Sequence, residues 1–156
     1  MNSPTSAPLQ RLSELGIELP TVPTPLASYV PAVRTGSYVY TSGQLPIVGG
    51  ELQATGKVGG EVTAEEAAGL ARTCALNALA AVHSVVDLDY VIRVIKVVGF
   101  VASTPDFTGQ PAVVNGASNF IGEVFGEAGA HARSAVGVAS LPLDAPVEVE
   151  IIVEVR

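Results

Sequence analysis

The sequence is poor in cysteine, which disulfide frameworks require, and in the basic residues that bind nucleic acids and anionic membranes. Cys74 is the only cysteine among 156 residues, so no disulfide can form within the chain, and we expect a reducing, cytoplasmic setting. Lys and Arg number 8 against 15 Asp and Glu, which gives a net charge of −7. Because a negative protein repels phosphate backbones and anionic lipids, we expect no nucleic-acid partner and no membrane partner.

Long apolar runs are also missing. No segment approaches the roughly 20 consecutive apolar residues of a membrane-spanning helix, and residues 1–20 lack the basic start and apolar run of a secretory signal. Charged residues make up only 15% of the chain and hydrophobic residues 48%, which leaves little charge to cover the surface of a monomer. The length fits one domain with its own core. We therefore expect a single domain over residues 1–156 that covers its apolar surface by oligomerisation.

What the chain does contain is an alternation of strand and helix patterns behind an N-terminal lead-in at residues 1–24. Prolines in residues 17–31 favour an extended arm there, because proline cannot donate to a strand ladder. In chain order, the predicted elements are a short helix at 9–16, strands at 37–47 and 49–57, a helix at 63–86, a strand at 90–103, a helix at 111–126 and strands at 131–141 and 146–155. This order predicts an α+β two-layer domain, with a mixed β-sheet and two helices packed on one face.

Two of these elements carry especially clear patterns. Thr63 and Glu66 form a capping box at the start of the alanine-rich helix. In the last strand, valine and isoleucine at odd positions from 147 to 155 alternate with Glu148, Glu150, Ile152 and Glu154, so one face belongs to the core and the other carries carboxylates.

Arg133 is the first candidate site residue. It stands near the start of an apolar strand in "GAHARSAVGVASLP", residues 129–142, and a guanidinium with few polar neighbours is suited to bind a carboxylate through two parallel hydrogen bonds. An ion pair with a strand glutamate is the alternative, which spacing alone slightly favours. His131 shares the strand face of Arg133 and either lines the same site or has a packing role. If "LPLDAP" closes a hairpin between the last two strands, Glu148 lies roughly 16 Å from Arg133.

Few other residue patterns suggest chemistry. Gly43, after Ser42, either exposes amide donors to a ligand or forms a bulge. The chain has no G-x-S-x-G motif and no phosphate-binding G-x-x-x-x-G-K-[ST] motif. His83, His131 and Cys74 do not have the spacing of a metal site, so we expect no metal.

Three blocks together resemble the RidA family, also called YjgF, the reactive-intermediate imine deaminases. They are "SYVPAVRTGSYVYTSGQLP", "VIKVVGFVASTPDF" and "ARSAVGVASLPLDAPVEVEIIVEV", and the similarity extends in order over residues 25–156 or so. The resemblance implies a chorismate mutase-like fold and a homotrimer with three clefts at the subunit boundaries. It also implies hydrolysis of 2-imino or 2-enamino acids, made by pyridoxal-phosphate enzymes, to 2-oxo acids and ammonia, without metal or cofactor.

The same resemblance implies roles for individual residues. Arg133 matches the arginine that binds the substrate carboxylate, and Glu148 matches the glutamate that positions the attacking water. The other matched positions are Gly43 with Ser42 at the backbone that approaches the ligand, Tyr29 in the cleft lining, Asn115 near the entrance and Lys96 on a strand.

The chain departs from the family pattern at three positions near the anchor. Ala135 stands where many members have cysteine, His131 where proline is common, and Ser118 where the helix often carries tyrosine. These departures leave the carboxylate anchor intact and put the shape of the pocket, and so the substrate, in doubt.

Three functions remain open from the sequence. The first is the deaminase, and the second is a non-catalytic trimer that binds small 2-oxo or other carboxylic acids with the same arginine. The third is a ribonuclease, which requires a phosphate-binding surface that the acidic charge does not provide. The sequence also leaves open whether Arg133 and Glu148 of one site come from one subunit or from two.

Overall fold

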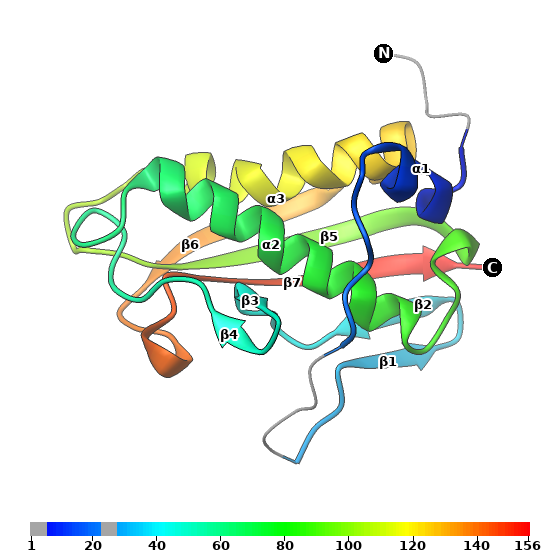
Figure 1. Ribbon diagram of the computed structural model, residues 1–156, viewed down its shortest axis with the longest axis horizontal. Helices are drawn as coiled ribbons and strands as arrows, with labels where there is room; N and C mark the ends of the chain where they lie inside the picture. Colours follow the sequence, from blue (N-terminus) through cyan, green and yellow to red (C-terminus); the bar gives the residue numbers. More distant parts are fainter. Residues whose placement is uncertain (1–5, 23–27) are drawn as a thin grey trace.

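One mixed sheet with helices on one of its faces forms the architecture of the protein (Figure 1). The computed structural model describes residues 6–22 and 28–156. In the sheet order β1-β2-β7-β5-β6, only the pair β5–β6 is parallel. The strands are β1 Ala32–Thr35, β2 Tyr38–Thr41, β5 Val91–Ala102, β6 Ala132–Val138 and β7 Val147–Val155. The predicted α+β two-layer fold is confirmed.

The helical layer consists of two long helices that pack on each other and on the sheet. They are α2 Ala64–His83 and α3 Gln110–Phe125. The predicted N-cap is present at the start of α2, where Thr63 Oγ1 accepts the Glu66 N–H at 3.1 Å. The Glu66 carboxylate accepts the Thr63 hydroxyl at 3.1 Å and not its backbone N–H, so only one half of the capping box is present. At the other end of the layer, α3 ends at Gly126, whose φ of 61° suits glycine. Small residues on the buried face of α2 let it lie close to β7, as its alanine content predicts.

Close approach of α2 and α3 depends on Gly116. A Cβ at this position would lie 2.6 Å from the carbonyl carbon of Ala68, which belongs to backbone that cannot move aside. We expect Gly116→Ala to lower the free energy of unfolding by about 1–3 kcal/mol through overpacking. Gly122 is a matched control on the same helix, because a Cβ there meets nothing within 4 Å. Denaturant unfolding should show Gly122→Ala stabilised by up to about 1 kcal/mol through helix propensity; a Gly116→Ala variant as stable as Gly122→Ala would contradict the close contact.

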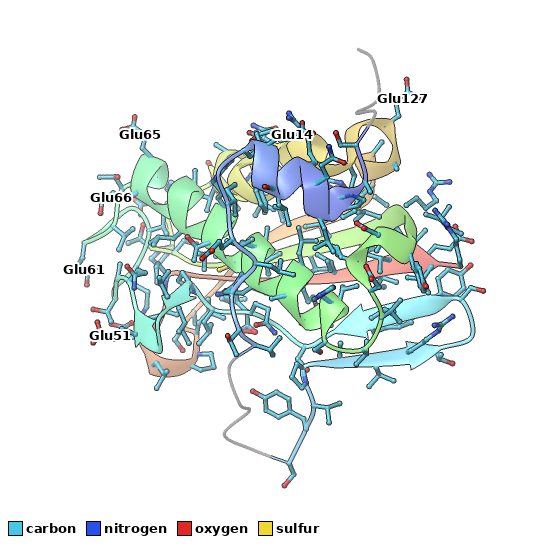
Figure 2. All side chains as sticks on the ribbon, turned by 45° about the vertical axis from the view of Figure 1, so that its right-hand side comes forward. Glu14, Glu51, Glu61, Glu65, Glu66 and Glu127 are labelled. Carbon is cyan, nitrogen blue, oxygen red and sulfur yellow. The ribbon has the colours of Figure 1, made fainter. Side chains whose placement is uncertain are left out.

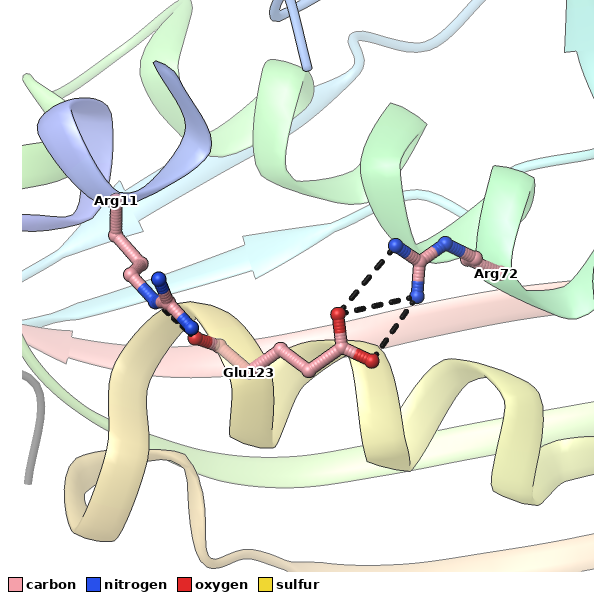
Figure 3. Close-up of polar contacts among 3 residues, drawn as sticks. All are labelled: Arg11, Arg72 and Glu123. Carbon is pink, nitrogen blue, oxygen red and sulfur yellow. Dashed lines mark hydrogen bonds and ion pairs between the residues drawn. The ribbon is translucent and has the colours of Figure 1, made fainter. Parts of the chain in front are cut away.

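The short helix α1, Pro8–Glu14, confirms the helix predicted at 9–16 and docks on the helical layer. Leu12 is 2% exposed, and Arg11 Nε donates to the Glu123 carbonyl at 2.9 Å. The carboxylate of the same Glu123 binds the Arg72 guanidinium at 3.2 Å, so one residue of α3 contacts both α1 and α2 (Figure 3). Of the predicted N-terminal lead-in and arm, residues 1–5 and 23–27 lie outside the described residues.

The predicted hairpin between the last two strands is wrong. β5 lies between β6 and β7, pairing with β6 in parallel and with β7 antiparallel. The chain passes from β5 through α3 to β6, and such a crossover places β6 parallel to β5 at the edge of the sheet. The other edge of β5 is then available to β7. The "LPLDAP" segment therefore forms a longer connection, with a 3₁₀ turn η3 at Pro142–Asp144.

The strands near the N-terminus also differ from the prediction. The strand predicted at 37–47 ends at Thr41, and its hairpin return pairs only within a small separate sheet of β3 Ile47–Val48 and β4 Glu51–Leu52. β1 was missing from the prediction, although alternating residues on both sides of Gly36–Ser37 are typical of a two-residue hairpin.

The sheet face opposite the helices carries apolar side chains that the described residues of the chain leave exposed. Tyr38 and Tyr40 are 42% and 47% exposed there, and Val136 on β6 is 43% exposed. The carboxylates of β7 lie on the same face, as predicted from the alternation of the last strand. This surface is consistent with oligomerisation, and the homotrimer stays a prediction. Among the described residues, no helix has both the length and the hydropathy of a membrane-spanning segment.

Candidate functional site

Arg133 points toward the helical layer from the edge strand β6. Its register partner on β5 is Val97, which is fully buried beneath the helices, and paired residues share a sheet face. Arg133 Nη1 donates to Asn115 Oδ1 at 2.7 Å and to Ser118 Oγ at 3.3 Å, both on α3. Within the described part of the chain Arg133 forms no ion pair, so the structure shows no strand glutamate of the same chain as its partner.

These contacts leave one edge of the guanidinium available. Both N–H groups of Nη1 are used, whereas Nε and Nη2 of Arg133 make no hydrogen bond to residues 6–22 or 28–156. The Nε–Nη2 edge offers two parallel N–H donors, the geometry that binds a carboxylate through both oxygens. Arg133 is half-buried, so a bound anion would be only partly screened by water.

His131 belongs to the same group of side chains. Its Nε2 lies 2.9 Å from Ser118 Oγ and its Nδ1 lies 2.6 Å from the Gly129 carbonyl oxygen. We call Asn115, Ser118, His131 and Arg133 the Arg133 cluster. The sequence singled out Ser118 only as a departure from a family pattern; its spacing of three residues from Asn115 places both on one face of α3 and could have indicated a shared contact.

A second group forms where β2 leaves the sheet. Pairing stops after Tyr40, opposite Ile152, and resumes at Gln44, opposite Val149, so β2 carries one residue more than β7 in this interval. The Thr41 hydroxyl accepts the N–H of Ile151 at 3.0 Å in place of a ladder bond. The structure therefore shows the bulge that the glycine allowed.

This bulge holds Ser42 by its backbone and side chain and leaves Gly43 open. The Ser42 N–H donates to the Pro31 carbonyl at 2.8 Å, and its hydroxyl donates to the Val30 carbonyl at 2.6 Å. In the described residues no hydrogen bond uses the Gly43 N–H. Tyr29, 55% exposed, precedes the segment that binds Ser42, which places it on this side of the molecule. A ligand at the bulge would thus meet a free amide donor.

Glu148 packs directly against this bulge. A Cβ on Gly43 would lie 2.7 Å from Cδ of Glu148, so only glycine leaves room for the carboxylate. Burial, and next the charge of Glu150, raise the pKa of Glu148 above its ordinary value. No cationic side chain of the described segments forms an ion pair with Glu148. We call Ser42, Gly43 and Glu148 the Gly43 cluster.

The two clusters lie on opposite faces of the sheet. Glu148 is level with Phe100 on β5, and Phe100 is level with Val136 on β6, all on the open face. Arg133 is on the helical face. It lies three residues before Val136 on β6, which is two strands away from β7. One small carboxylic acid therefore cannot contact both Arg133 and Glu148 of the same chain.

Lys96 lies apart from both clusters. It is half-buried on the open face of β5, level with Ile152 and Ala132. Together with Tyr40 and Glu150 it lines a small hollow of that face. Within the described residues, no three His, Cys, Asp or Glu side chains gather as a potential metal site.

Comparison with known proteins shows a family that this chain resembles over most of its length. The family model described as "Endoribonuclease L-PSP" matches residues 20–155. "Protein TCP17" of Trypanosoma cruzi is 47% identical over 149 residues, 93% of this chain and 92% of the relative. A "2-iminobutanoate/2-iminopropanoate deaminase" of Dermatophagoides farinae is 33% identical over 142 residues, 90% of this chain and 95% of the relative.

A solved structure shows the same fold throughout the chain. A protein of unknown function from Agrobacterium tumefaciens has 48% sequence identity and superposes with a TM-score of 0.89. The match covers 96% of this chain and 93% of that protein. The likeness therefore includes the strands and the helix that carry both clusters.

Proposed function

The chain belongs to the endoribonuclease L-PSP family, the family of YjgF and RidA, and on this basis we propose that it hydrolyses 2-imino and 2-enamino acids to 2-oxo acids and ammonia. The observation that carries the proposal is the Nε–Nη2 edge of Arg133, which makes no hydrogen bond to the described residues while neutral partners hold Nη1. Such an edge fits a small carboxylate, and one relative is named for substrates that have this group. Each site lies in a cleft between subunits of a homotrimer.

Two copies of the chain are needed because each carries the halves of a site on different faces. The Arg133 cluster sits at the edge strand β6, where a neighbouring copy can approach, and the Gly43 cluster lies on the apolar open face. A ring of three copies would bring the Arg133 cluster of each to the Gly43 cluster of the next, giving three identical sites.

The proposed reaction uses Arg133 for binding and Glu148 for proton transfer. Arg133 binds the substrate carboxylate, and the Gly43 N–H binds the polar end near the reacting carbon. Glu148 accepts a proton from a water molecule as the water oxygen bonds to C2 of the imine, and then delivers a proton to the nitrogen. The product of this addition is a 2-amino-2-hydroxy acid. Its hydroxyl proton then passes to the nitrogen, the C–N bond breaks with loss of neutral ammonia, and the C=O bond of the 2-oxo acid forms. Orientation and general acid–base catalysis are the contributions of the protein.

The test is the hydrolysis of freshly generated 2-iminobutanoate. Its rate is measured by the release of ammonia and compared with the spontaneous rate. Acceleration by the purified protein supports the deaminase. Saturable binding of 2-oxobutanoate without any acceleration would instead establish the non-catalytic carboxylic acid binder. Salt-sensitive RNA cleavage abolished by a site substitution would establish the ribonuclease, which the net charge of −7 opposes. Part of this negative charge lies around the end of the molecule where α2 begins, on Glu51, Glu61, Glu65 and Glu66 (Figure 2).

A shared site also predicts complementation between two inactive variants. Arg133→Ala and Glu148→Gln each destroy one half of every site in their own trimers. When the two variants are co-expressed, a site with Arg133 from one chain and Glu148 from the other is intact, and random mixing produces about a quarter of such sites. We expect ammonia release to return to about that fraction of the wild-type rate. Mixed trimers as inactive as either parent would place both halves of the site in one chain.

A further inference from the structure

Ser118 and His131, two departures from the family pattern, contact each other and the anchor. The distance from His131 Nε2 to Ser118 Oγ is 2.9 Å, and Ser118 Oγ is also 3.3 Å from Arg133 Nη1. Ser118 is half-buried on α3 and His131 is half-buried just before β6. The hydroxyl of Ser118 thus connects the imidazole of His131, just before β6, with the guanidinium of Arg133 on β6.

The donors and acceptors of this chain of contacts are determined by its two ends. The Gly129 carbonyl can only accept, so Nδ1 of His131, 2.6 Å away, carries the proton. In the neutral ring Nε2 is then an acceptor, and the Ser118 hydroxyl donates to it. This directs the lone pairs of Ser118 toward Arg133, whose Nη1 donates to them. Every polar atom in this path then has a partner of the correct kind.

We propose that Ser118 and His131 act together as a positioning pair for the carboxylate anchor. His131 fixes the direction of the Ser118 hydroxyl, and Ser118 with Asn115 holds Nη1 of Arg133. With Nη1 held by two acceptors, the guanidinium cannot rotate freely, and its Nε–Nη2 edge faces the ligand in one orientation. The inference rests on the proposed function only for the identity of that ligand.

The tautomer of His131 is the first test, and His83 is a built-in reference. His83 Nδ1 accepts the Leu88 N–H at 3.1 Å, so neutral His83 must carry its proton on Nε2. At a pH where both rings are neutral, two-bond ¹H–¹⁵N spectra should show Nδ1–H for His131 and Nε2–H for His83. Ser118→Ala should shift the Nε2 resonance of His131 and leave His83 unchanged. An Nε2–H tautomer at His131 would overturn the proposal without reference to any substrate.

Ligand binding and kinetics are the second test. Loss of one hydrogen bond to the charged anchor, with Asn115 still present, should raise the Kd for 2-oxobutanoate and the KM for 2-iminobutanoate about tenfold in Ser118→Ala, with kcat within about twofold of wild type. His131→Ala should match this, and the double variant should be no worse than either single variant because the two residues act as one unit. Ser118→Thr keeps a hydroxyl and His131→Gln keeps an acceptor, so both variants should bind 2-oxobutanoate with a Kd near that of wild type.

The controls separate this inference from the proposed function. Asn119→Ala changes the next, exposed residue of α3 and should leave Kd unchanged. A Kd in Ser118→Ala equal to that of wild type, or additive effects on Kd in the double variant, would overturn the positioning pair. Neither result would contradict the proposed deaminase activity. Binding that follows the expected pattern without imine hydrolysis would support the pair and overturn the deaminase. If the wild-type protein neither binds 2-oxobutanoate nor hydrolyses the imine, both proposals fall.

Discussion

Replacing Arg133 by alanine is expected to lower kcat/KM for 2-iminobutanoate by about 10²–10³-fold. Removing one partner of a hydrogen-bonded charge pair typically costs 2–5 kcal/mol of binding free energy, and in the proposed function the other partner is the substrate carboxylate. Steady-state kinetics with kcat and KM determined separately would measure the loss. Calorimetry should show the same loss in the affinity for 2-oxobutanoate.

Arg133→Lys is the matched control for the anchor. Lysine keeps the positive charge but lacks the planar pair of donors, so we expect activity between wild type and Arg133→Ala. Folding should be little changed in both variants, because Arg133 is half-buried and its partners Asn115 and Ser118 can bind water. Undiminished deaminase activity in Arg133→Ala would remove the proposed anchor.

Replacing Glu148 by glutamine is expected to lower kcat by about 10²–10⁴-fold, the usual contribution of a general acid–base residue. Glutamine has the same shape and still fits against Gly43, but it cannot accept a proton from water. Because the proposed role of Glu148 is to act on the water and not on the substrate carboxylate, the Kd for 2-oxobutanoate should change little. A Glu148→Gln variant with the kcat of wild type would contradict the role of this residue.

The pH dependence of the reaction provides a further check on Glu148. Burial, and then the nearby Glu150, raise the pKa of Glu148 above 4.5. Only the carboxylate form can accept the proton, so kcat should fall with decreasing pH at a higher pH than an ordinary glutamate would give. Glu150→Gln removes one cause of the shift and should move this fall to lower pH.

The same shift predicts how Glu148→Gln affects folding. A carboxyl whose pKa is raised in the folded state contributes less to stability as the pH rises through its ordinary and then its raised value. At neutral pH the charged form is therefore disfavoured in the folded protein. We expect Glu148→Gln to be at least as stable as wild type there, which separates loss of catalysis from loss of fold.

The sequence predicted the elements of the fold better than their arrangement. Alternation in Val147–Val155 and the N-cap at Thr63 are local patterns, and the structure contains both. The pairing of β7 depends on which strand edges remain free after the β5–α3–β6 crossover. No local pattern near residues 139–146 indicates which edges these are. The wrong hairpin between β6 and β7 has this cause.

The candidate site was predictable in its residues but not in its division between two faces. Arg133 was named from its position in an apolar strand and Glu148 from a family resemblance. An alternating strand shows that its two faces differ without showing which face meets the helices. Once β5 is placed between the two strands, the register with Val97 and Phe100 separates the residues. The contact of Ser118 with Arg133 depends on the packing of α3 against β6, which a sequence alone does not contain.

Under the proposed function, the separation of the two clusters makes activity depend on protein concentration. An isolated copy has every residue of the proposed site and yet no complete site, because its halves face different directions. Dilution below the dissociation constant of the assembly would therefore abolish the proposed activity while each chain stays folded, and the rate per chain would rise again as copies accumulate. A cell could then set the onset of this activity through the amount of protein that it makes.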